Sequence, residues 1–136
     1  MNSINTYQQL IEEALKGKNY GSNPKELYAP IEYIMSLGGK RMRPVLVLMA
    51  CELFDGDVKN ALHPSLAIEL FHNFTLVHDD IMDKAPLRRG KQTVHAKWND
   101  NIAILSGDAM MVRAYQELCK ADAVILPALL DIFSDT

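Results

Sequence analysis

The chain has 136 residues, of which 49% are hydrophobic and 23% charged, and its formal net charge is -3 at pH 7. This length supports one domain with a hydrophobic core, and the composition is that of a globular protein. No basic bias is visible, which excludes the usual nucleic-acid-binding classes. The longest apolar run, 45–51, is far too short to span a bilayer, and the N-terminus lacks the features of a signal peptide.

Two cysteines, Cys51 and Cys119, stand far apart and without metal-binding spacing. We expect both to be buried free thiols in a reducing compartment, because cytosolic thiols rarely form disulfides. The sequence therefore predicts a cytoplasmic protein.

Apolar residues recur at helical spacing along the chain, and no segment alternates long enough to predict a sheet. Pro86 disfavours helix at the residue before it, so the helix that precedes it should stop there. The charged segment 87–92 is expected to be a loop. The fold class predicted is all-α, with helices over 7–15, 24–37, 44–53, 64–84, 93–98, 101–120 and 122–133.

The long helix predicted over 64–84 ends in three aspartates. At about 100° per residue, Asp79 and Asp83 share one stripe with His72, and Asp80 lies on its shoulder. The cluster ends an otherwise apolar helix and a basic loop follows it, so a functional site is favoured over a solvated acidic face. The opposite side of the helix should face the core, and it consists of Leu66, Leu70, Val77 and Ile81.

Carboxylate oxygens are ligands that Mg²⁺ prefers, one or two of them alongside phosphate oxygens and water. We therefore expect Asp79 and Asp83 to hold magnesium against a diphosphate. Arg88 and Arg89, in the loop that follows, carry the guanidinium forks that match phosphate oxygens. Acids, metal and arginines together predict a diphosphate site.

A second basic group, Gly38-Gly39-Lys40-Arg41-Met42-Arg43-Pro44, separates two predicted helices. Basic residues also favour a helix C-terminus, so this group alone is ambiguous. Combined with the acidic cluster, it predicts a second phosphate site.

Together the two motifs resemble those of the trans-isoprenyl diphosphate synthase family. Asp79-Asp80-Ile81-Met82-Asp83 with Arg88-Arg89-Gly90 resembles the family's first aspartate-rich motif, and Gly39 to Pro44 resembles its isopentenyl diphosphate motif. The resemblance runs from about Tyr28 to the end of the chain, and it includes Gly107-Asp108.

The resemblance implies a helical bundle in which Asp79 and Asp83 bind the Mg²⁺ that grips an allylic diphosphate. Asp80 would support them, and Arg88 would contact the same diphosphate. The remaining substrate, isopentenyl diphosphate, would be held by Lys40, Arg43, His72 and Arg89. The implied reaction is ionisation of dimethylallyl, geranyl or farnesyl diphosphate, attack by isopentenyl diphosphate and loss of a proton. Members of the family are commonly homodimers.

The chain also departs from the family pattern, because neither the second aspartate-rich motif nor the intervening lysine is recognisable. Asp131 and Asp135 are four residues apart, but we interpret them as a solvated face. Residues 1–136 are therefore expected to form a single partial domain, the N-terminal half of the bundle, with little activity alone. The residues five and four before Asp79 set product length in the family, so Phe74 and Thr75 predict a medium product, farnesyl or geranylgeranyl diphosphate.

Three alternatives stay open from the sequence. A class I terpene cyclase also ionises prenyl diphosphates, but it needs no second basic site, so Lys40 and Arg43 argue against it. A non-catalytic subunit could bind prenyl diphosphates without turnover. A purely structural helical protein would show no magnesium-dependent response to diphosphate.

Overall fold

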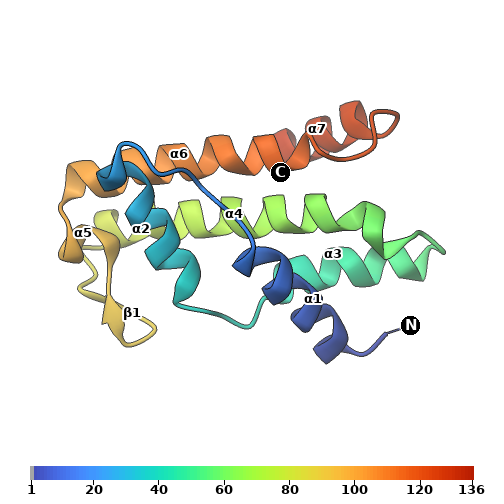
Figure 1. Ribbon diagram of the computed structural model, residues 1–136, viewed down its shortest axis with the longest axis horizontal. Helices are drawn as coiled ribbons and strands as arrows, with labels where there is room; N and C mark the ends of the chain where they lie inside the picture. The colour runs from blue at the N-terminus through green and yellow to red at the C-terminus, as the bar shows by residue number, and fades with distance from the viewer. Residues whose placement is uncertain (1) are drawn as a thin grey trace. The chain divides into compact units, whose positions relative to one another are not determined.

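The computed structural model describes residues 2–136 and is built almost entirely from helices (Figure 1). This confirms the all-α prediction. Within the described range, the elements in chain order are α1 Ile4–Lys16, α2 Lys25–Ser36, α3 Met42–Leu53, α4 Val58–Met82, β1 Leu87–Arg88, β2 Lys91–Gln92, α5 Val94–Lys97, α6 Asp100–Leu118 and α7 Leu126–Asp135.

The chain divides into two compact units. Unit 1 comprises the chain up to Lys16 together with Lys40–Glu69 and Ala114–Thr136, and unit 2 comprises Gly17–Gly39 and Leu70–Arg113. Helices α4 and α6 each contribute residues to both units. That residues 1–136 form one domain stays a prediction.

The core of unit 1 is built where α1 packs against α3 (Figure 1). Tyr7, Ile11 and Leu15 of α1 are buried and recur every four residues, so they form one helix face. Val45 and Leu48 of α3 are buried as well. Burial of this apolar stripe is what stabilises a short N-terminal helix that would be marginal alone.

The core of unit 2 combines α2 with parts of α4, α5 and α6. Ile31 and Ile34 of α2 are fully buried, as are Ala103 and Met110 of α6. Val94 of α5 is buried too, and α2 contacts α5. The elements that bear the candidate aspartates therefore rest on a packed apolar layer.

Helix α4 is longer than expected and is drawn as one long helix in Figure 1. The predicted start at Pro64 is wrong, since α4 begins at Val58 and passes through this proline. The carboxylate of Asp57 accepts the Lys59 N–H at 2.9 Å, which caps the earlier start. A proline removes only one bond from the helix ladder, and a helix of 25 residues tolerates that loss.

The predicted core side of α4 is largely confirmed. Leu66, Leu70 and Val77 are buried, whereas Ile81 is only half-buried. The helix ends at Met82, two residues before the predicted end.

Segment 87–92 corrects the prediction of a loop, because it forms the antiparallel hairpin β1–β2. Its two central residues, Arg89 and Gly90, have φ values of 52° and 74°. Two positive φ values are the mark of a type I′ turn, which matches the twist of hairpin strands. Strands of two residues are too short for an alternating pattern, so the sequence pattern missed them.

Near the C-terminus, α7 begins at Leu126 rather than at Asp122. The Asp122 carboxylate accepts the Val124 N–H at 2.8 Å, so Asp122 forms a turn ahead of the helix. The prediction of buried cysteines is also wrong: both are free, but Cys51 is half-buried and Cys119 exposed. Among residues 2–136, we find no helix with the length and hydropathy needed to cross a membrane.

Candidate diphosphate-binding site

The aspartate cluster lies at the C-terminal end of α4. Asp79 and Asp83 are exposed, and the Asp83 N–H donates to the Asp79 carbonyl at 2.8 Å, so the two residues are one helical turn apart. The chain then leaves the helix through Lys84, whose φ is 52°. Its N–H donates to Ile81 and that of Ala85 to Asp80, which is the Schellman arrangement for ending a helix. The predicted one-turn pair of carboxylates is therefore present.

Asp80 differs from its neighbours because it is only 3% exposed. Both of its carboxylate oxygens accept hydrogen bonds from Arg88 on β1, Nε to Oδ2 and Nη2 to Oδ1, each at 2.9 Å. The hydrogen bond to Asp80 outweighs partial burial and raises the pKa of Arg88. This bidentate pair fixes the plane of the guanidinium, so Asp80 orients Arg88 beside the exposed carboxylates.

Arg89 is held by the loop that follows α2. Its Nη1 donates to the Gly38 carbonyl, and a Cβ on Gly39 would lie 3.2 Å from the guanidinium. Glycine at position 39 therefore leaves room for this side chain. The hairpin gains a second attachment to α2 where the Tyr33 hydroxyl donates to the Gln92 carbonyl at 2.8 Å.

The three cations of the second basic group belong to unit 1, and their environments differ. Lys40 and Arg43 are exposed, as binding to a phosphate requires. Arg41 is 4% exposed and hydrogen-bonds to Glu12 on α1 and to Glu69 on α4. The sequence did not separate Arg41 from its neighbours, because the partners lie 29 and 28 residues away.

The remaining predicted residues lie along α4 in unit 2. His72 and Thr75 are half-buried, and the Thr75 hydroxyl donates to the His72 carbonyl at 2.7 Å. The Phe74 ring makes edge-to-face contacts with Phe71 and with His78, at centroid distances of 5.2 and 4.8 Å. Phe74 therefore lies on the His78 side of the helix, whereas Thr75 precedes Asp79 by one turn.

His78 is a residue that the sequence reasoning missed. Its Nε2 lies 3.2 Å from the Ile104 carbonyl and 3.7 Å from the Asp108 carboxylate, both on α6. A Cβ on Gly107 would lie only 2.4 Å from this nitrogen. Gly107 thus leaves the space in which His78 contacts α6. The only signal in the sequence was a glycine inside a predicted helix, where glycine is otherwise unfavourable.

The carboxylates suit Mg²⁺ only in combination with a further oxygen donor. Within residues 2–136, no three His, Cys, Asp or Glu side chains gather closely enough to hold a metal ion by themselves. Asp79 and Asp83 are hard oxygen donors exposed to solvent, and Mg²⁺ commonly takes one or two carboxylates plus phosphate oxygens and water. The donor set therefore fits a magnesium ion shared with a bound diphosphate.

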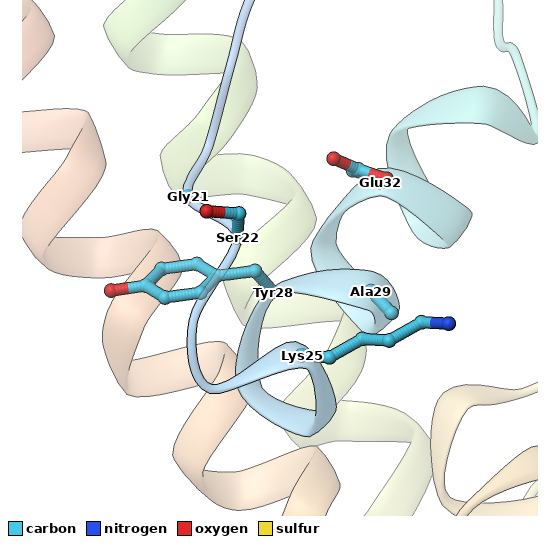
Figure 2. Close-up of a pocket in the computed structure, with 6 residues that line it drawn as sticks. All are labelled: Gly21, Ser22, Lys25, Tyr28, Ala29 and Glu32. Carbon is cyan, nitrogen blue, oxygen red and sulfur yellow. The ribbon is translucent and has the colours of Figure 1, made fainter.

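A separate pocket of about 260 Å³ lies on α2, and Figure 2 shows the six residues that line it. The Tyr28 ring lies against the preceding loop, where a Cβ on Gly21 would approach it to 2.6 Å. Arg113 stacks over the same ring, 5.5 Å from its centroid. The pocket contains none of the predicted site residues, which are Lys40, Arg43, His72, Phe74, Thr75, Asp79, Asp80, Asp83, Arg88 and Arg89.

The all-α fold of the chain is also that of the isoprenoid synthases among its structural neighbours. Comparison with known proteins agrees, since a model of the Polyprenyl synthetase family matches residues 24–136. The chain belongs to the polyprenyl synthetase family.

Among similar proteins, a geranylgeranyl diphosphate synthase of Methanosarcina mazei is 43% identical over 101 residues, covering 74% of this chain and 31% of that protein. A geranylgeranyl pyrophosphate synthase of Geoglobus acetivorans is 44% identical over 113 residues, covering 83% and 34%. A crystal structure of a geranylgeranyl pyrophosphate synthase superimposes with a TM-score of 0.95 at 47% identity, covering 99% of this chain and 41% of that one. The chain thus spans about a third of the length of these curated relatives.

Proposed function

We propose that the protein carrying this chain is a magnesium-dependent trans-prenyltransferase that condenses isopentenyl diphosphate with an allylic diphosphate. The observation that carries this proposal is the pair Asp79 and Asp83, two exposed carboxylates one turn apart beside an oriented Arg88. Because Asp80 balances the charge of Arg88, the other two carboxylates attract additional cations. Similarity to geranylgeranyl diphosphate synthases supports the assignment.

In this reaction the allylic C–O bond breaks and its electron pair leaves with the diphosphate. The isopentenyl double bond then attacks the carbocation, forming a C–C bond, and loss of a proton restores a double bond. Magnesium, when bound, stabilises the negative charge that develops on the leaving diphosphate. Asp79 and Asp83 hold this ion, and Arg88 presents fixed N–H donors to the same diphosphate.

Isopentenyl diphosphate is assigned to Lys40, Arg43, His72 and Arg89. The exposure of Lys40 and Arg43 supports this part of the proposal, since a phosphate ligand must reach them from solvent. These two cations also argue for a synthase rather than a terpene cyclase, since a cyclase needs no second basic diphosphate site. Replacing both by alanine should abolish isopentenyl diphosphate binding and leave magnesium-dependent binding of geranyl diphosphate intact.

Product length is proposed to be medium, farnesyl or geranylgeranyl diphosphate. Phe74 and Thr75 are the residues assigned to this control. The names of the similar proteins favour the geranylgeranyl product.

The test is a thermal unfolding measurement on the 136-residue chain with geranyl diphosphate and MgCl₂, together and separately. At a ligand concentration of 100 Kd, binding stabilises a protein by about 2.7 kcal/mol. We expect a rise in Tm only when both are present, and none in the double variant Asp79→Asn and Asp83→Asn. This readout does not require turnover, of which we expect little from the chain alone.

The chain offers a matched control for this variant. Asp131 and Asp135 are exposed on α7 at the same spacing, so Asp131→Asn with Asp135→Asn should keep the full response. If the chain shows no magnesium-dependent shift, the proposal fails.

We also expect a homodimer in the cytoplasm. Exposed apolar residues on α6, Ile104, Leu105 and Val112, support an association surface, and the two free thiols support a reducing compartment. Light scattering during size-exclusion chromatography measures the oligomeric state, and a monomeric mass contradicts the dimer.

A further inference from the structure

The loop of the second basic group contains a strained arginine. Arg41 has φ 50° and ψ 32°, a left-handed conformation that residues with a Cβ rarely adopt. Such a conformation persists only where surrounding contacts over-determine it. In unit 1 those contacts come from two helices.

The first contact is with α1. The Arg41 Nε donates to Glu12 Oε1 at 2.7 Å, and one turn earlier the Gln8 side-chain amide donates to the Lys40 carbonyl at 2.8 Å. Gln8 and Glu12 are four residues apart, so they lie on the same face of the helix. Helix α1 thus forms hydrogen bonds with two consecutive residues, Lys40 and Arg41. Helix α1 itself lies outside the segment 24–136 that matches the family model.

The second contact is with α4. The Arg41 Nη1 donates to Glu69 Oε1 at 2.6 Å, and the Glu69 side chain is 4% exposed. Burial disfavours the charged guanidinium, but the hydrogen bonds that Arg41 donates to Glu12 and Glu69 outweigh it and raise the pKa of Arg41. Arg41 therefore stays charged, and breaking its hydrogen bonds to the two carboxylates would cost free energy, because buried charges would be left without compensation.

We infer that Arg41 is a positioning residue, clamped by Gln8, Glu12 and Glu69 so that the flanking Lys40 and Arg43 are held ready for isopentenyl diphosphate. The inference rests on the proposed function, because it explains the affinity of that site. Arg41 does not touch the ligand, since its guanidinium is buried against carboxylates. Of the two exposed cations, Lys40 precedes Arg41 in the loop, and Arg43 lies two residues after it in the first turn of α3.

Glu12 is the side chain to change, because it is 38% exposed and its loss leaves Glu69 in place. Glu12→Gln weakens a charge-assisted hydrogen bond without altering the shape of the side chain. Affinity falls in proportion to the population of the competent loop, so we expect about a tenfold rise in the Kd of isopentenyl diphosphate. The affinity for geranyl diphosphate with magnesium should change less than about twofold, because the residues assigned to that site, Asp79, Asp83 and Arg88, make no contact with Glu12 that we describe.

Adjacent residues of α1 supply matched controls. Glu13 and Gln9 are exposed, so Glu13→Gln and Gln9→Ala should leave both affinities unchanged, whereas Gln8→Ala should weaken isopentenyl diphosphate binding. Calorimetric titration of the 136-residue chain with each diphosphate measures the affinities. If Glu12→Gln binds as Glu13→Gln does, or weakens both ligands equally, the clamp is overturned and the proposed function stands.

A measurement without ligand separates the two failures further. The Val45 N–H donates to the Arg41 carbonyl at 3.1 Å, so exchange of this amide reports whether the loop is held. Exchange should be faster in Glu12→Gln than in Glu13→Gln, and equal rates would overturn the clamp. If the unaltered chain binds neither diphosphate, the proposed function is wrong and the inference falls with it.

Discussion

Asp80 is buried and accepts both hydrogen bonds of the Arg88 fork, while Asp79, the residue before it, is exposed. Two adjacent aspartates thus have different environments. An exposed carboxylate at a helix C-terminus is unfavourable, because it opposes the helix dipole. A buried carboxylate paired with arginine is different, because its removal leaves the charge of the arginine without compensation. This difference leads to opposite effects of the same substitution.

Asp80→Asn should lower the free energy of unfolding by about 2–3 kcal/mol, because it leaves the partly buried Arg88 without its counter-charge. Asp79→Asn should raise it by about 0.3 kcal/mol, since repulsion from Asp83 is relieved. Urea denaturation without ligand measures both. Equal effects from the two variants would contradict the assignment of Asp80 as the residue that orients Arg88.

Gly107→Ala should displace His78, because the new Cβ would lie 2.4 Å from Nε2. Overpacking of this kind costs about 1–3 kcal/mol, partly offset by about 1 kcal/mol of improved helix propensity. Adding His78→Ala removes the clash, so a double-mutant cycle measured in urea should show coupling of about 1–2 kcal/mol. Additive effects would mean that the two residues do not share this space.

Phe74→Ala in the complete synthase should give a longer product, because removing the ring opens space beside His78 for the growing chain. Thr75→Ala is the comparison, since it shortens the residue one turn before Asp79. Chromatography of the products after dephosphorylation measures chain length. A product unchanged by Phe74→Ala refutes its role and leaves Thr75 as the candidate.

Acid should destabilise unit 1 through Glu52, whose carboxylate accepts hydrogen bonds from the Tyr7 hydroxyl and from Asn2. The Tyr7 hydrogen bond comes first among the causes that lower the pKa of Glu52 from its ordinary value of 4.5. A lowered folded-state pKa contributes stability above pH 4.5, and this stability is lost as the pH falls through the lower value.

The measurement is the urea midpoint between pH 7 and pH 3. As the pH is lowered through about 4.5, the urea concentration at the midpoint should decrease for the unaltered chain. The decrease should be smaller for Tyr7→Phe over the same pH range. Parallel curves would show that this hydrogen bond does not contribute.

The sequence by itself determined the features that depend on helical geometry. The spacing of Asp79 and Asp83 placed the two one helical turn apart, with Asp79 in α4 and Asp83 directly after its last residue, and the apolar positions Leu66, Leu70 and Val77 of α4 are buried. These predictions hold because side-chain direction repeats every 3.6 residues whatever the helix packs against. The one-turn spacing of the two carboxylates follows from local structure alone.

Only the tertiary structure decided which charges are exposed. Lys40, Arg41 and Arg43 are equivalent in the sequence, yet Arg41 alone turns inward, because Glu12 and Glu69 approach it from two other helices. In the same way Asp80 differs from Asp79 in exposure because Arg88 of the hairpin forms hydrogen bonds with Asp80 alone. A charge is buried only where folding supplies a partner, and partners distant along the chain leave no periodic signal in the sequence.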